Sequence, residues 1–195
     1  MRLLPASVPT GSRSGSRTWL RPAAVLLAAA GLGVFLWGAY IPVKAWAAHV
    51  LLQDAWDRAA GGDERAKPWP WADTRPVAKI WVERLGQSNI VLAGAQGRTL
   101  AFGPGHLDGT ALPGAPGHSV ISAHRGTHFR WLEKAQVGDL IETERPDGAR
   151  GPYRIVEKRI IDSREEQIAV HPDRDLLTLI TCSPWRTGTR AAPCG

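Results

Sequence analysis

The sequence predicts an all-β domain that follows an N-terminal membrane anchor. From Val77 onward, short segments of alternating apolar residues are separated by Gly and Pro, a spacing typical of a β-barrel or a β-sandwich. Residues 23–43 form an uncharged apolar run, and a single bilayer span needs roughly 20 such residues. Arginines, but no acidic residues, precede that run.

The N-terminal region is expected to set the topology of the chain. Residues 1–22 are rich in Ser, Gly, Pro and Arg and are expected to be disordered. Because arginines precede the span at 23–43, the N-terminus should stay in the cytoplasm and the later residues should lie outside, in the periplasm if the cell is Gram-negative. A cleaved signal peptide is the alternative, with an A-x-A site at residues 45–47. We favour an uncleaved anchor, because the run exceeds the roughly 7–15 apolar residues of a signal peptide.

Residues 44–76 are expected to connect the anchor to the β domain. A helix is predicted over 44–60, where Ala48, Leu51, Leu52, Ala55 and Ala59 form an apolar stripe. Gly61 and Gly62 should end this helix. A segment rich in Pro and Trp then forms an extended arm.

Residues 77–195 are expected to form the main domain, with an irregular C-terminal end. One short helical turn is predicted at 129–135. The predicted strands lie within residues 77–85, 89–94, 118–123, 138–144, 153–162 and 176–181.

Charge and cysteine content exclude several classes of function. The net charge is +6, but arginines beside an apolar run indicate membrane topology, so no nucleic-acid partner is expected. The two cysteines, Cys182 and Cys194, are too few for a disulfide scaffold, and no C-x-x-C pair suggests zinc. We therefore expect neither a metal nor a cofactor.

Two predicted strands end in residues that could be reactive, His124 and Cys182. Cys182 could be a buried core residue, half of a disulfide with Cys194, a metal ligand or a nucleophile. A nearby imidazole can generate the reactive thiolate, and such Cys and His residues are commonly far apart in sequence. A disulfide with Cys194 would abolish the nucleophile, and we expect Cys182 to be a thiol.

The remaining histidines are expected to be structural or solvated. His128 follows His124 by four residues, but Gly126 argues against a helical metal site, and we expect a packing or loop role for it. His106 and His118 lie in segments rich in Gly and Pro and are expected to be solvated. Arg125 should face away from His124, because successive strand residues point to opposite faces.

Three segments resemble the sortase family. "TLITC" at 178–182 is similar to the T-L-x-T-C signature of sortases, and "SAHRGTHF" at 122–129 is similar to their histidine segment. A loop rich in Gly and Pro leads into that segment, as in sortases. The "KPWPWAD" and "THFRWL" segments resemble the Gram-negative class. The resemblance covers residues 77–184.

The resemblance implies an eight-stranded β-barrel that is a membrane-anchored cysteine transpeptidase, with hydrolase chemistry like that of a thiol protease. Cys182 would attack an LPxTG-type C-terminal sorting signal and form a thioester, and His124 would donate and accept protons. The implied partners are a secreted protein that carries the signal, an amine acceptor of unknown identity, and the membrane. The alternatives are a sortase-like module that binds sorting signals without turnover, and a structural membrane-anchored barrel.

The chain departs from the sortase pattern at three places. Ala123 replaces a glycine, which should cost little if its φ is negative. Ser183 replaces an aromatic residue. After Trp185 no strand pattern follows, so we expect the last strand to be missing or truncated and this copy to be poorly soluble and impaired. Arg190 is the substitute we expect for the family's substrate-holding arginine.

A reporter fused after Gly195 tests the predicted topology. The fusion should be active only outside the cytoplasm, because the arginines precede the span. A fusion that is active in the cytoplasm would overturn the predicted orientation. If the anchor is cleaved instead, mass spectrometry should find a new N-terminus near His49.

Overall fold

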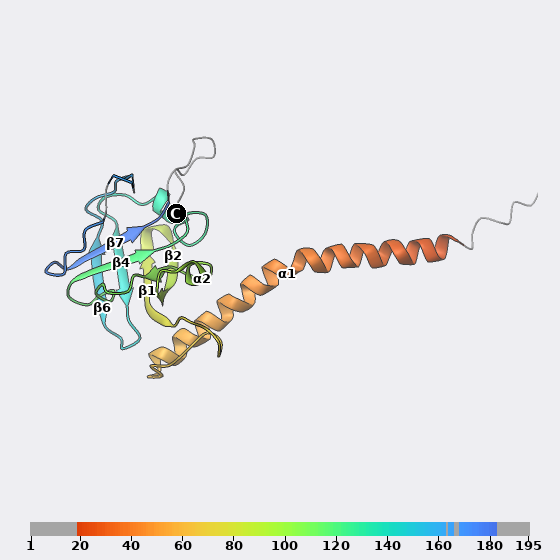
Figure 1. Ribbon diagram of the computed structural model, residues 1–195, viewed down its shortest axis with the longest axis horizontal. Coiled ribbons are helices and arrows are strands. Elements are labelled where there is room, and N and C mark those ends of the chain that lie inside the picture. Colours follow the sequence, from red (N-terminus) through yellow and green to blue (C-terminus); the bar gives the residue numbers. More distant parts are fainter. Residues whose placement is uncertain (1–18, 163, 166–167, 183–195) are drawn as a thin grey trace, which may run out of the picture. The chain divides into compact units, whose positions relative to one another are not determined.

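The computed structural model describes residues 19–162, 164–165 and 168–182. Its elements are one long helix, one short α-helix, two 3-10 helices and a β-sheet (Figure 1). The helices are α1 (Leu20–Ala60), η1 (Glu83–Leu85), α2 (Gly97–Leu100) and η2 (Arg130–Glu133). The strands are β1 (Pro76–Val82), β2 (Gln87–Ala93), β3 (Gly105–His106), β4 (His118–Ser122), β5 (Leu140–Glu144), β6 (Arg150–Arg154) and β7 (Leu176–Ile180).

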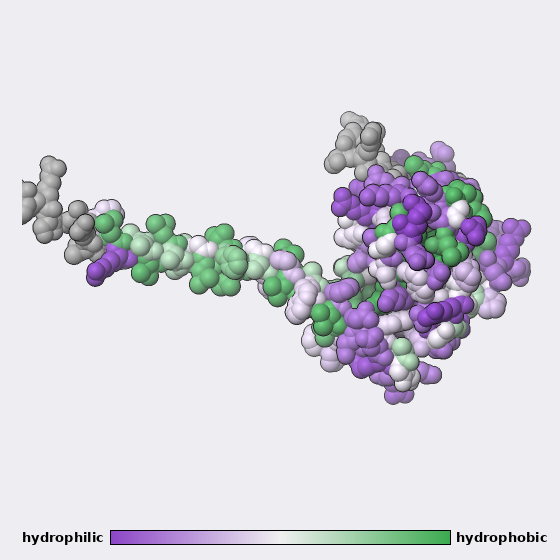
Figure 2. All heavy atoms as spheres, turned by 180° about the vertical axis from the view of Figure 1, so that it is seen from behind, coloured by the Kyte–Doolittle hydropathy of each residue, from purple (hydrophilic) through white to green (hydrophobic). Residues whose placement is uncertain are grey.

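Helix α1 combines the predicted anchor and the following helix in one continuous element. The chain divides into two compact units, Met1–Trp46 and Ala47–Gly195, so α1 belongs to both. In its first part the side chains are mostly exposed and largely apolar (Figure 2). Within the described residues, α1 is the one helix long and apolar enough to cross a membrane.

The second part of α1 belongs to the unit that contains the sheet. Leu52 and Ala55 of the predicted apolar stripe are buried there, as is Trp56, whereas Leu51 of that stripe is 41% exposed. The helix ends at Ala60, as the two glycines predicted. Gly62 follows with φ of 98°, a conformation that side chains other than glycine's rarely adopt.

The sheet has seven strands in the order β6-β5-β1-β2-β3-β4-β7 and forms a nearly closed barrel. Neighbouring strands are antiparallel except for β2–β3 and β4–β7, which are parallel. Strands β4 and β7 lie side by side in Figure 1 although 53 residues, 123–175, separate the end of β4 from the start of β7. This arrangement confirms the predicted all-β barrel.

The barrel core is built from the alternating apolar residues of the strands. Ile80 and Val82 of β1 are each 1% exposed, and Val91, Ile121 and Phe129 are fully buried. Complete burial of one such side chain contributes roughly 1.5–3 kcal/mol to folding. The predicted helical turn at 129–135 is η2, whose Trp131 also packs into this core.

Two parts of the sheet differ from the prediction. The strand expected within 153–162 is β6, which begins earlier and ends at Arg154. Ile155 directly after it still packs against the core, but Val156 and Ile160 are each 77% exposed, so the predicted strand does not continue to residue 162. Strand β3 was not predicted, because two residues are too few to show a period.

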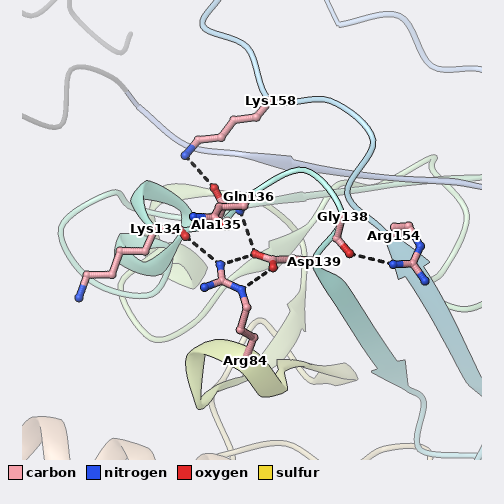
Figure 3. A network of polar contacts seen from close by, with 8 residues as sticks. All are labelled: Arg84, Lys134, Ala135, Gln136, Gly138, Asp139, Arg154 and Lys158. Carbon is pink, nitrogen blue, oxygen red and sulfur yellow. Dashed lines mark hydrogen bonds and ion pairs between the residues drawn. The ribbon is translucent and has the colours of Figure 1, made fainter.

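An ion pair fastens the turn after β1 to the loop before β5 (Figure 3). Arg84 of η1 donates from Nη2 to Oδ2 of Asp139 at 2.6 Å and from Nη2 to the Lys134 carbonyl at 3.0 Å. The backbone N–H of Gln136 donates to Asp139 at 2.8 Å. Hydrogen bonding from Arg84, and then from Gln136, lowers the pKa of Asp139 from 3.8 to about 2.

Asp139→Asn should destabilise the fold, because Asp139 is buried and loses its charge-assisted bonds to Arg84. A carboxyl with a lowered folded-state pKa stabilises the fold above the unfolded pKa, and this contribution disappears as the pH falls. Urea unfolding at pH 7 should therefore have a lower midpoint in Asp139→Asn, and the difference from wild type should shrink between pH 3.8 and pH 2.

Asp147→Asn is the matched control, because Asp147 also pairs with an arginine but its side chain is 61% exposed. It should leave the midpoint nearly unchanged, since exposed ion pairs contribute only about 0–1 kcal/mol. An equal drop of the urea midpoint in the two variants would contradict a stabilising role of the Arg84–Asp139 ion pair.

Candidate active site

The candidate site lies at one end of the parallel pair β4–β7. The register pairs His118 with Leu176 and continues in step to Ser122 with Ile180. Paired residues of neighbouring strands lie on the same face of a sheet, about 4.8 Å apart. Both strands run toward the same end, so both residues predicted to be reactive leave the sheet at one rim.

Backbone contact between the two segments continues beyond the strands. The N–H of Ala123 donates to the Ile180 carbonyl at 3.1 Å. The hydroxyl of Thr181 donates to the Ala123 carbonyl at 2.9 Å. These two bonds keep the segments adjacent as far as Ala123 and Thr181, the residues that precede His124 and Cys182.

A tight turn over residues 124–129 holds the histidine segment. The His124 carbonyl accepts from the N–H groups of Thr127 at 3.4 Å and Phe129 at 3.3 Å. Phe129 is fully buried and packs edge-to-face on Trp131, with ring centroids 5.7 Å apart. His124 itself is exposed, so a rigid apolar anchor supports an accessible imidazole.

Ala123 adopts a conformation that a side chain tolerates. No described residue other than glycine has a positive φ. The prediction that alanine replaces glycine here without backbone strain is therefore confirmed.

Cys182 is half-buried and disulfide-bonded. The sequence analysis expected a thiol, so the structure shows the oxidised state instead. The other cysteine of the sequence is Cys194, which lies outside the described residues. Arg190 and Ser183 also lie outside them.

His128 is half-buried in the turn, which agrees with the packing or loop role expected for it. Burial lowers the pKa of His128, a hydrogen bond to the Ala101 backbone opposes this shift, and the charge of His124 lowers it further. His128 therefore connects the histidine turn to the loop after α2.

Two other histidines correct the sequence analysis. His106 is 6% exposed and His118 is 3% exposed, although both were expected to be solvated. Each is held by hydrogen bonds, His106 to the Ala111 carbonyl at 2.8 Å and His118 to the Thr178 hydroxyl at 2.7 Å. Neighbouring Gly and Pro suggested exposed loops, but these residues begin or end strands.

Other surfaces offer no competing arrangement of reactive groups within the described residues. No group of three His, Cys, Asp or Glu side chains gathers there as metal ligands would. A hollow beside the ion pair is lined by Glu83, Arg84, Leu140 and Glu142, none of which belongs to β4 or β7.

Solved sortase structures are similar to this chain. A sortase D5 transpeptidase from Clostridium perfringens is 27% identical with a TM-score of 0.52, over 57% of this chain and 72% of that one. The lid mutant of Streptococcus agalactiae sortase C1 is 28% identical with a TM-score of 0.51, over 73% of this chain and 81% of that one. A lid mutant of Corynebacterium diphtheriae sortase A is 24% identical with a TM-score of 0.53, over 70% and 85%, and supports the fold alone.

A family model also matches this chain. No curated protein matches the chain. The Sortase domain model matches residues 80–192, which are more than half of the 195 residues. The matched range includes both strands that lead to His124 and Cys182. The chain therefore belongs to the sortase family, whose members are cysteine transpeptidases.

Proposed function

We propose that this sortase cleaves an LPxTG-type C-terminal sorting signal through a thioester on Cys182 and transfers the protein to an amine. One observation carries the proposal: β4 and β7 are paired in parallel and in register, so the segments that lead to His124 and Cys182 leave the sheet at the same rim. From that rim, the imidazole of His124 and the sulfur of Cys182 would both reach one substrate.

In the proposed reaction, the Cys182 thiolate attacks the carbonyl carbon of the scissile peptide. The tetrahedral intermediate collapses as the C–N bond breaks, and His124 gives its proton to the departing amine. An incoming amine then attacks the thioester and gives a proton back to His124. The new amide forms, the Cys182 thiolate leaves, and both residues return to their starting states.

An exposed histidine suits this proton transfer. An imidazole can act both as a proton donor and as a proton acceptor in catalysis. His124 is exposed and can meet solvent, substrate and the amine acceptor. For the substrate-holding arginine that stabilises the oxyanion, we propose Arg190 on the sequence alone.

The proposed setting is the outer side of the cytoplasmic membrane. Helix α1 would be the anchor, since its first part is apolar and unburied. The arginines that precede it favour a cytoplasmic N-terminus and an outer catalytic domain. Secreted proteins with sorting signals would meet the enzyme there. We also propose the Gram-negative class, on the "KPWPWAD" and "THFRWL" segments.

The disulfide on Cys182 favours a second candidate function for the oxidised chain. A sulfur already bonded to sulfur cannot form the thioester, because the thiolate is the nucleophile. The oxidised chain would then bind a sorting signal without cleaving it. Reduction separates the two functions, since only the thiol form can turn over.

Cys182→Ala in the full chain should abolish cleavage of a fluorogenic LPxTG-type peptide and should remove the acyl adduct from the mass spectrum. Cys194→Ala is the matched control, because it removes the other cysteine and leaves the proposed nucleophile. Under reducing conditions the control should cleave at the wild-type rate. Cleavage by Cys182→Ala would refute the nucleophile role.

Reductant should activate the wild-type chain, because Cys182 is disulfide-bonded. We expect cleavage to be undetectable without dithiothreitol and to appear with it. Cys194→Ala should cleave without reductant, since it leaves one cysteine in the chain. A wild-type rate that is the same with and without reductant would show that the disulfide does not limit activity.

A further inference from the structure

His118 connects β4 to β7 at the end opposite the candidate site. Its Nε2 lies 2.7 Å from the Thr178 hydroxyl of β7. Its Nδ1 accepts from the backbone N–H of His171 at 3.0 Å. Only 3% of the surface of His118 is exposed, and both ring nitrogens are hydrogen-bonded within the protein.

These contacts define one protonation state. Because a backbone N–H can only donate, Nδ1 must be the bare nitrogen and Nε2 must carry the proton. Nε2 therefore donates to Thr178. A doubly protonated ring would point an N–H at the N–H of His171, which breaks that hydrogen bond.

The bond from His118 to Thr178 runs diagonally across the strand pair. The register pairs His118 with Leu176, whereas Thr178 pairs with Val120. Backbone bonds support the same end, because Leu176 N–H donates to the Gly117 carbonyl at 3.1 Å and Gly117 N–H donates to Asp175 at 2.7 Å.

This register sets which residues of β4 and β7 lie side by side just before His124 and Cys182. A shift of one residue would turn every side chain of β7 to the other face. A diagonal side-chain bond resists such a shift, since Thr178 would move to the opposite face from His118.

The surroundings disfavour a charged His118. The His171 ring is stacked on it, with centroids 6.0 Å apart and an interplanar angle of 4°. Asp175 is engaged by Gly117, and the buried His106 is engaged by the Ala111 carbonyl and by Thr110. Asp173 and Arg174, the other charged groups of the 171–175 segment, are exposed. Burial, and then the charge of His171, lowers the pKa of His118.

We propose that neutral His118 is a positioning residue that locks the β4–β7 register, and that acid releases the lock. The lock itself stands on the hydrogen bonds of His118. Its consequence for catalysis rests on the proposed function of His124 and Cys182.

The sign of the pH effect follows from the lowered pKa. Between the folded-state pKa and 6.5, the unfolded chain binds the proton and the folded chain does not. Stability from this group is complete above pH 6.5 and falls as the pH drops through this window. The unfolded chain binds at most one more proton than the folded chain at this group. The unfolding equilibrium constant should therefore rise by up to about tenfold for each unit by which the pH falls within this window.

Histidine-selective NMR of the full chain in detergent micelles tests the protonation state. The chain has 6 histidines, and His118→Asn identifies the signal of interest. We expect the ¹⁵N shifts of a neutral ring protonated at Nε2, with a titration midpoint below 6.5. His171→Ala keeps the backbone N–H but removes the neighbouring charge, so the midpoint should rise. A ring protonated at Nδ1, or a midpoint at or above 6.5, would overturn the lock.

Urea unfolding between pH 5 and pH 8 tests the linkage. His118→Asn should flatten the pH dependence, because asparagine does not titrate. His49→Gln replaces an exposed histidine of α1 and should keep the wild-type slope. A wild-type slope in His118→Asn would contradict the proposal.

Peptide cleavage separates this proposal from the proposed function. The wild-type rate should fall more steeply in acid than the rate of His118→Asn, because protonation of His118 releases the lock only in the wild type. If cleavage is absent in every variant while the NMR and unfolding results hold, the proposed function fails and the lock stands. If the cleavage rates of the wild type and of His118→Asn fall identically as the pH decreases, the lock has no catalytic role and that part of the proposal fails.

Discussion

The parallel pairing of β4 with β7 is the constraint on which the candidate site depends. These strands are distant in sequence, and each leads directly to one of the two residues that could be reactive. Parallel strands need a long connection, which is supplied here by β5, β6 and the segments around them. Because both strands run in the same direction, their ends meet at one rim. An antiparallel pairing would have sent His124 and Cys182 to opposite ends of the barrel.

The rest of the domain holds this pair in place. Phe129 and Trp131 anchor the turn that follows β4 into the core, which fixes the chain on the C-terminal side of His124. The Arg84–Asp139 pair fastens the start of β5 to the turn after its neighbour β1. The exposed histidine therefore sits on a stiff support, and little conformational entropy needs to be lost when a substrate binds.

Much of this fold could be predicted from local patterns, because strands such as β1 bury every second residue, as at Ala78, Ile80 and Val82. The motifs around His124 and Cys182 also indicated the family, and the family model confirms it. The sequence-based predictions that were wrong concerned features that tertiary contacts determine. The burial of His118 comes from Thr178 and His171, which are 60 and 53 residues away in the chain. The apolar residues after Arg154 alternate as in a strand, but Val156 and Ile160 are exposed, and β3 is too short to show any period. Arg190 lies outside the described residues, so its assignment stays a prediction.

The most direct test of the account is a cross-link between the ends of β4 and β7. Paired strand residues have the Cα separation that a disulfide needs, about 4.4–6.8 Å. In a Cys194→Ser background, His124→Cys should form a disulfide with Cys182, which mass spectrometry of the digested chain detects as a linked peptide pair. Arg125→Cys in the same background is the control and should form less of the link, because residue 125 lies in the turn, farther from the end of β4. No link from position 124, or as much of it from position 125, would contradict the proposed juxtaposition of the two strand ends.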